Sequence, residues 1–198
     1  MLSVVIATQD SERMLVPTLA ALVAGAVEGV VHEVIVADAG SRDATAAIAD
    51  GAGCRFLASN ASRGARLKAA AGTARAPWLF FLKPGVVPDA TWIDETRRFI
   101  EESELRGCSG ARAAVFRTAS ASFGPSVVEA LALLGAALGV RPTDGHTLVI
   151  AKTFYDALGG HRDIDTPERD LARRLGRRRR VLLRTGATML PGTQKLDT

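Results

Sequence analysis

The sequence predicts a single α/β domain with a Rossmann-like, mostly parallel sheet flanked by helices. Three observations support this prediction. Short apolar runs, typical of strands buried on both faces, recur through the first half of the chain. A segment with helical spacing of its apolar residues follows each run, and this alternation indicates parallel strands joined by right-handed crossovers. The length of 198 residues and the hydrophobic content of 47% suit one domain with a buried core.

The first expected strand and helix open the chain. Leu2–Ala7 is an apolar run that ends in a polar loop, Thr8–Glu12. Apolar residues then recur at helical spacing from Leu15 to Ala26. Pro17 lies near the start of this helix, where its missing N–H group is harmless.

The second expected strand, Val34–Ala37, ends at a turn that carries an isolated carboxylate, Asp38. Gly40 can take the positive φ that a tight turn needs, and a short helix is expected over Thr45–Ala49. Ligands of open α/β sheets bind just beyond the carboxyl ends of the strands. Asp38 therefore either accepts hydrogen bonds from a base or a ribose, or satisfies the amides of its own turn.

The alternation continues through two more pairs of strand and helix. The strands are expected at Cys54–Ala58 and Trp78–Leu82, and the helices at about Arg63–Ala74 and Thr91–Ser103. The loops that follow the four strands should share one rim of the sheet, where we expect the ligand. These loops are Thr8–Glu12, Asp38–Asp43, Ser59–Arg66 and Lys83–Gly85.

The second half of the chain has a less regular pattern. An apolar segment, Ser126–Leu138, predicts a helix that either packs on the sheet or faces a membrane or a second subunit. The other expected elements are strands at Ala113–Arg117, Thr147–Ile150 and Val181–Leu183, a loop at Ser120–Pro125, and helices at Phe154–Leu158 and around Leu171–Leu175.

Arginines are concentrated near the C-terminus, although the net charge of the chain is only +4. Seven of them lie between Arg173 and Arg184. The cluster is interpreted as a solvated basic face or as a contact with anionic lipid headgroups. Nucleic-acid binding is disfavoured because no aromatic side chain in the cluster can stack on bases.

The cysteines and the apolar runs bear on the compartment. Cys54 and Cys108 lie far apart without metal-type spacing, which favours a reduced chain. No signal peptide precedes the first strand, and the longest apolar run, Val127–Val140, is too short to span a bilayer. We therefore expect a cytoplasmic protein, either wholly dissolved or peripheral to the membrane.

Several common catalytic motifs are missing. The first strand is not followed by Gly-x-Gly-x-x-Gly, and there is no P-loop, which disfavours dinucleotide and P-loop nucleotide binding. There is no Gly-x-Ser-x-Gly segment, and the three histidines are scattered.

Four segments, in their order and spacing, resemble the family-2 glycosyltransferases of GT-A fold, most closely a short bacterial subgroup. Together they span nearly the whole chain. Leu2–Glu12 resembles the opening strand and its polar loop, and Glu33–Thr45 resembles the Val-Asp-x-Gly-Ser-x-Asp-x-Thr motif. Gly64–Leu82 resembles the helix and strand that lead to the metal motif. Tyr155–Gly160 and Pro167–Leu175 resemble Leu-Gly-Gly-Phe and the Glu-Asp-x-x-Leu helix.

The resemblance implies transfer of a sugar from a nucleotide-sugar donor to an unknown acceptor, with inversion. Residues 1–105 would form the nucleotide-binding half and residues 106–198 the acceptor-side half. Thr8 and Asp38 would contact the nucleotide base. Glu168 aligns with the catalytic carboxylate, the general base that deprotonates the acceptor hydroxyl. The alternative for Glu168 is a charge in a first helical turn, favoured there by the helix dipole.

The chain departs from the family at the metal motif. The resemblance implies Asp-x-Asp and a Mg²⁺ or Mn²⁺ ion, but the sequence there reads Lys83-Pro84-Gly85, and Asp89 follows too late. Either Lys83, Lys68 and Arg66 supply the positive charge in a metal-independent transferase, or the chain is an inactive relative that binds a nucleotide or a protein partner. A nucleotidyltransferase is disfavoured because Thr8–Glu12 lacks a Gly-rich basic loop.

Overall fold

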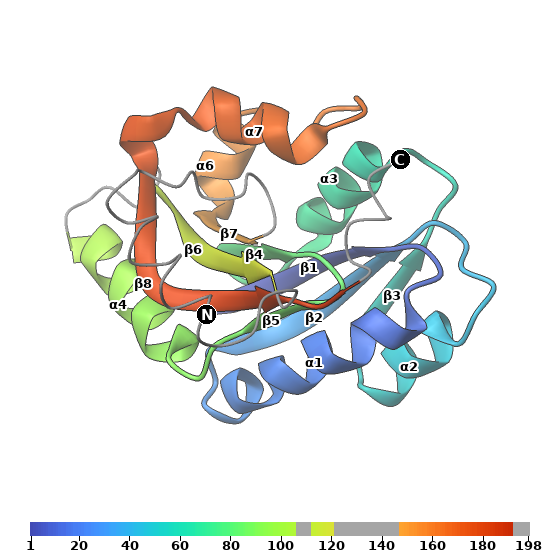
Figure 1. The fold of residues 1–198 in the computed structure, drawn as a ribbon. Helices are drawn as coiled ribbons and strands as arrows, with labels where there is room; N and C mark the ends of the chain where they lie inside the picture. Colours follow the sequence, from blue (N-terminus) through green and yellow to red (C-terminus); the bar gives the residue numbers. More distant parts are fainter. Residues whose placement is uncertain (106–111, 121–146, 192–198) are drawn as a thin grey trace.

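The computed structural model describes residues 1–105, 112–120 and 147–191 (Figure 1). Within these ranges the chain forms one eight-stranded sheet with the strand order β3-β2-β1-β4-β7-β6-β8-β5. The expected helix at Ser126–Leu138, most of the expected loop at Ser120–Pro125, and Cys108 lie outside the described residues.

The first half of the chain alternates strand and helix as expected. Its elements are β1 (Leu2–Thr8), α1 (Glu12–Val27), β2 (Val31–Asp38), α2 (Thr45–Gly51), β3 (Arg55–Ala58), α3 (Arg63–Thr73) and β4 (Trp78–Leu82). β1 pairs in parallel with β2 and with β4, and β2 pairs in parallel with β3. The predicted parallel sheet is therefore confirmed over this half.

The second half completes the sheet with mixed pairing. Its elements are β5 (Val86–Pro88), α4 (Trp92–Leu105), β6 (Ala113–Ser120), β7 (Thr147–Ala151), α6 (Lys152–Ala157), α7 (Pro167–Leu175), a 3-10 turn η1 (Arg177–Arg179) and β8 (Arg180–Met189). β7 runs antiparallel to β4 and β6, and β8 pairs in parallel with β6 and antiparallel with β5. The three-residue strand β5 was not expected, because so short a run has no period of its own.

Helices cover both faces of the sheet (Figure 1). α1, α2 and α4 lie on one face, and α3, α6 and α7 lie on the other. Successive residues of β4 show both faces buried. The ring of Phe80 lies 5.7 Å from that of Trp92 in α4, whereas the ring of Phe81 lies 5.1 Å from that of Tyr155 in α6. The continuous apolar run of β4 is explained by this double burial.

α1 and α4 pack closely where a glycine faces a tryptophan. A Cβ atom on Gly25 would lie 2.6 Å from the indole ring of Trp92, so only glycine fits at this position without a shift. An ion pair of 3.2 Å between Arg97 of α4 and Glu28, the residue that follows α1, lies beside this contact. None of the helices in the described part of the chain has the length and apolar character needed to cross a bilayer.

Candidate functional site

The loops after β1 and β2 form one continuous rim at the carboxyl end of the sheet, as expected. Hydrogen bonds tie the two loops together. The Asp10 amide donates to the Ser41 hydroxyl at 2.8 Å, and the Arg42 amide donates to the Asp10 carboxylate at 2.8 Å. The Glu12 amide donates to the Asp43 carboxylate at 2.9 Å. Asp10 takes a positive φ of 43°, so its cross-loop bonds hold a backbone conformation that most residues avoid.

Asp38 lies at the centre of this rim and is 1% exposed. One carboxylate oxygen accepts hydrogen bonds from the hydroxyls of Thr8 at 2.7 Å and Ser41 at 2.5 Å. The other accepts from the amides of Gly40 at 2.8 Å and Ser41 at 2.6 Å. Burial raises the pKa of Asp38, but these hydrogen bonds outweigh burial and hold the pKa below its usual value.

The structure thus brings Thr8 and Asp38 together and shows Asp38 in its turn-building role. A carboxylate has about four acceptor positions, and all four are used within the protein. Contact with a nucleotide base requires exchange of one of these bonds. The base contact of Thr8 and Asp38 stays a prediction.

Arg66 lies in the first turn of α3 and is directed into the protein. Its Nη1 donates to the carbonyl oxygens of Thr8 at 3.0 Å and Ala37 at 2.5 Å, and its Nε donates to that of Ala61 at 3.2 Å. The side chain is buried, and burial, aided by the nearby charge of Arg63, lowers its pKa. Arg66 joins the carboxyl ends of β1 and β2. The expected contact of Arg66 with a diphosphate stays a prediction.

Lys83 and Lys68 occupy different environments. Lys83 directly follows β4 and is 6% exposed. Its turn is fixed by the Gly85 amide, which donates to the Met14 carbonyl and the Thr18 hydroxyl, both at 2.9 Å. Lys68 is exposed and lies two residues after the buried Arg66, roughly 200° further round the helix. The structure therefore does not bring Lys68 together with Arg66.

Glu168 forms an ion pair that sequence reasoning missed. Its Oε1 lies 2.7 Å from Nε of Arg63, and the two side chains are 14% and 19% exposed. Glu168 is in the first turn of α7, and Arg63 is the first residue of α3. α3 packs closely on α7 and on the loop before it, because a Cβ atom on Gly64 would lie 3.2 Å from the Cβ atom of Pro167 and only 1.9 Å from the Arg162 carbonyl oxygen. No local sequence pattern indicates the contact between Arg63 and Glu168, because the two residues lie far apart in the chain.

A second cluster fixes the Gly159-Gly160 turn against α7. Arg174 donates from Nε to Asp170 at 2.7 Å and from Nη2 to the Gly160 carbonyl at 2.7 Å, and its Nη1 donates to the Leu158 carbonyl. The positions of α7 and of the turn before it are therefore coupled. Asp170 was not singled out in the sequence, and Arg174 was counted there with the C-terminal arginines, although their spacing of four residues suits a helical ion pair.

His161 is buried beside the same turn. Its Nδ1 lies 2.9 Å from the Tyr155 hydroxyl, which also accepts from the His161 amide at 2.9 Å. Burial lowers the pKa of His161 to about 3, and the charges of Arg174 and Arg63 act in the same direction. Burial also raises the pKa of Tyr155 to about 12. Both groups are therefore neutral at pH 7 and serve packing.

The described residues do not fit a divalent metal site. Lys83, Pro84 and Gly85 occupy the place of the metal motif and offer no carboxylate. Asp89 accepts a hydrogen bond from the Gly186 amide at 2.9 Å and so holds β8. No group of three His, Cys, Asp or Glu side chains in the described ranges could hold a metal ion.

The comparison with protein families identifies the chain. The model of the family described as "Glycosyl transferase family 2" matches residues 3–124, which is more than half of the chain. The protein belongs to glycosyl transferase family 2. The comparison with curated proteins found no match.

Solved structures share the fold of this chain. S. aureus TarS 1-349 aligns with a TM-score of 0.73 at 13% identity, over 99% of this chain and 62% of that chain. S. aureus TarS 1-349 in complex with UDP-GlcNAc aligns with a TM-score of 0.72 at 14% identity, over 96% of this chain and 58% of that chain. Glucosyl-3-phosphoglycerate synthase from Mycobacterium tuberculosis, in complex with Mn²⁺, UDP and glucosyl-3-phosphoglycerate, aligns with a TM-score of 0.64 at 18% identity. The alignment covers 96% of this chain and 70% of that chain.

These likenesses establish the GT-A fold that the sequence predicted. This family-2 chain spans less than two thirds of the length of the TarS chains. The matched family segment ends at residue 124, so Glu168 and α7 lie beyond it.

Proposed function

We propose that the protein transfers a sugar from a nucleotide-sugar donor to an acceptor hydroxyl with inversion, and that Lys83 takes the place of the metal ion. The observation that carries the proposal is the ion pair of 2.7 Å between Glu168 and Arg63. It fixes a carboxylate at the N-terminal end of α7, close to the start of α3. Family membership and the UDP-containing complexes of similar fold support the choice of donor.

In the proposed reaction Glu168 removes the proton from the acceptor hydroxyl. The acceptor oxygen forms a bond to the anomeric carbon of the sugar while the bond from that carbon to the diphosphate breaks. A nucleoside diphosphate leaves with the electron pair, and Glu168 keeps the proton. Arg63 positions Glu168, because an arginine fixes the direction of a carboxylate better than water does.

Lys83 would neutralise the leaving diphosphate. It follows β4 by one residue, and the alternation of the strand continued by one step places it on the face of Phe81, whose ring lies 4.8 Å from that of His161. This is the face that α3 and α7 cover. A fixed cation in a buried position acts more strongly on a developing negative charge than the same cation in water.

The test is calorimetric titration with UDP, GDP and dTDP, with Mn²⁺ or with EDTA. We expect one nucleotide to bind equally well under both conditions. Lys83→Ala should abolish this binding, and Lys83→Met, which keeps the length of the side chain but not its charge, should do the same. Glu168→Gln should still bind the nucleotide but lose transfer activity by roughly 10²–10⁴-fold, because only proton transfer is removed.

Three outcomes would overturn parts of the proposal. Unchanged binding by both Lys83 variants would refute the substitution of the metal by Lys83. Binding that depends on Mn²⁺ would mean that side chains other than those at the Lys83 turn hold a metal. A complete lack of nucleotide binding would favour the second candidate, an inactive relative that binds a protein partner. The inward direction of Arg66 and the filled acceptor positions of Asp38 are the observations that favour this candidate.

A further inference from the structure

A strongly basic surface lies at the corner where α7 ends and β8 begins. Between Leu171 and Pro191 the sequence contains seven arginines and no carboxylate. We call the exposed part of this region the basic corner. It consists of Arg173, Arg177, Arg178, Arg179, Arg184 and the half-buried Arg180.

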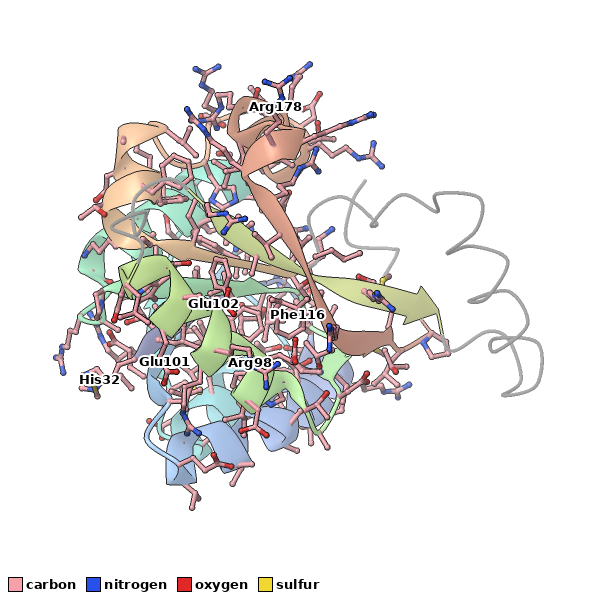
Figure 2. All side chains as sticks on the ribbon, turned by 90° about the vertical axis from the view of Figure 1, so that its left-hand side faces the viewer. His32, Arg98, Glu101, Glu102, Phe116 and Arg178 are labelled. Carbon is pink, nitrogen blue, oxygen red and sulfur yellow. The ribbon has the colours of Figure 1, made fainter. Side chains whose placement is uncertain are left out.

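The local structure explains why these side chains point outward. α7 buries Leu171 and Leu175, so Arg173 lies on its outer side, where its Nη2 donates to the Asp170 carboxylate at 3.2 Å. Gly176, with φ 74°, ends the helix and turns the chain into η1, in which no residue is buried. Figure 2 shows Arg178 at the outer end of the molecule, with nitrogen-tipped side chains spread around it.

An exposed leucine lies within the basic corner. Alternate residues of a strand share a face, so Leu182 lies on the same face of β8 as Arg180 and Arg184, whereas Leu183 is buried on the opposite face. Leu182 is 45% exposed. An apolar side chain between guanidinium groups suits the boundary between phosphate headgroups and acyl chains.

We propose that the basic corner docks the protein on an anionic lipid bilayer. The guanidinium groups would bind headgroup phosphates, often through two hydrogen bonds each, while Leu182 enters the boundary layer. Glu101 and Glu102 of α4 lie away from Arg178 (Figure 2), whereas Glu95 of the same helix accepts a hydrogen bond from the Arg184 amide at 3.3 Å and is the α4 carboxylate next to the basic corner.

A bilayer fits the basic corner better than a nucleic acid does. There is no aromatic residue between Arg162 and Pro191 on which a base could stack. The nearest described aromatic partner is Phe154, which is 5% exposed and covered by the Arg179 guanidinium at 5.6 Å from the ring centre. An exposed leucine contributes to binding a bilayer but has no partner on a phosphate backbone.

Docking would also bring the membrane surface close to Glu168. Glu168 lies in the first turn of α7 and the basic corner at its other end, and the nine residues of α7 span roughly 14 Å. The docked orientation therefore suits an acceptor that is carried on a lipid. This statement about the acceptor rests on the proposed function, whereas the docking itself does not.

The test measures how much protein sediments with phosphatidylcholine vesicles that do or do not contain phosphatidylglycerol, without nucleotide. We expect binding only to the anionic vesicles, and weaker binding at high salt. An arginine at an anionic surface contributes a factor of about five to binding. The affinity of the double variant Arg177→Glu and Arg178→Glu for the anionic vesicles should therefore fall at least roughly twentyfold. Leu182→Ser should bind these vesicles more weakly than the wild type.

The matched control reverses two exposed arginines elsewhere, Arg13 in α1 and Arg75 after α3, with the same change of net charge. It should bind vesicles nearly as well as the wild type. Equal loss in the control and the double variant would overturn the proposal, because net charge alone would then explain binding. Absence of sedimentation, or tighter binding to a single-stranded oligonucleotide than to the vesicles, would overturn it as well. Circular dichroism checks that each variant is folded, and nucleotide titration tests the proposed function separately.

Discussion

Substitution of Gly64 by alanine tests the contact that places Glu168 beside α3. Gly64 is the second residue of α3, and its backbone faces the Arg162 carbonyl oxygen that precedes α7. A Cβ atom there would lie 1.9 Å from that oxygen, whereas an ordinary contact begins at 3.4 Å. The two backbone segments would have to separate by about 1.5 Å, because the obstacle is backbone and cannot rotate away.

The expected cost of Gly64→Ala is about 1–3 kcal/mol of unfolding free energy, the usual range for overpacked interiors. The same helix offers a matched control. Gly72 has nothing within 4 Å of its added Cβ and has a helical backbone, so Gly72→Ala should stabilise the protein by about 1 kcal/mol. Opposite signs are therefore expected for one chemical change at two positions of α3.

The assay is urea unfolding followed by circular dichroism, combined with the transfer assay. Gly64→Ala should lower the unfolding midpoint and reduce turnover, because Glu168 moves relative to α3, while nucleotide binding through Lys83 changes less. A free energy of unfolding within 0.5 kcal/mol of the wild type, or equal effects at Gly64 and Gly72, would refute the reasoning.

Two further predictions concern stability in acid. The pKa of His161 is about 3 in the folded state against a usual 6.5, so the unfolded chain binds the proton first as the pH falls. Stability should fall below pH 6.5 by up to about 1.4 kcal/mol per pH unit, and His161→Phe should flatten this slope in urea titrations at several pH values. Burial raises the pKa of Glu33, but hydrogen bonds from Arg55, the Arg75 amide and Ser3 outweigh burial and lower the pKa to about 2 from 4.5. The stabilisation by ionised Glu33 should be lost as the pH falls from 4.5 towards 2, and Glu33→Gln should remove this dependence on pH. If the unfolding free energy of the His161 or the Glu33 variant depends on pH as that of the wild type does, the role given to that residue is wrong.

The parallel half of the fold was predictable because its signal is local. β4 is an uninterrupted apolar run, and burial of Phe80 and Phe81 on opposite faces is the physical cause of that run. β5 was not predictable, because its three residues form a strand only by pairing with β8, which lies far away in the sequence.

The candidate site was predictable in part. Thr8 and Asp38 end neighbouring parallel strands, so their meeting at 2.7 Å follows from the strand order. Whether a basic side chain faces inward or outward is set by packing, and sequence spacing alone did not separate the buried Arg66 from the exposed Lys68.

The sequence by itself determined the strand and helix alternation, the rim of polar loops and the loss of carboxylates after β4. These features depend on residues close together in the chain, whose periodicity and turn chemistry are visible without a structure. Only the tertiary structure decided that Arg63 holds Glu168, that Arg66 joins two strand ends, and that Leu182 shares a surface with the arginines. The physical reason is that side-chain partners and exposure are set by contacts between distant segments, which the folded chain alone brings together.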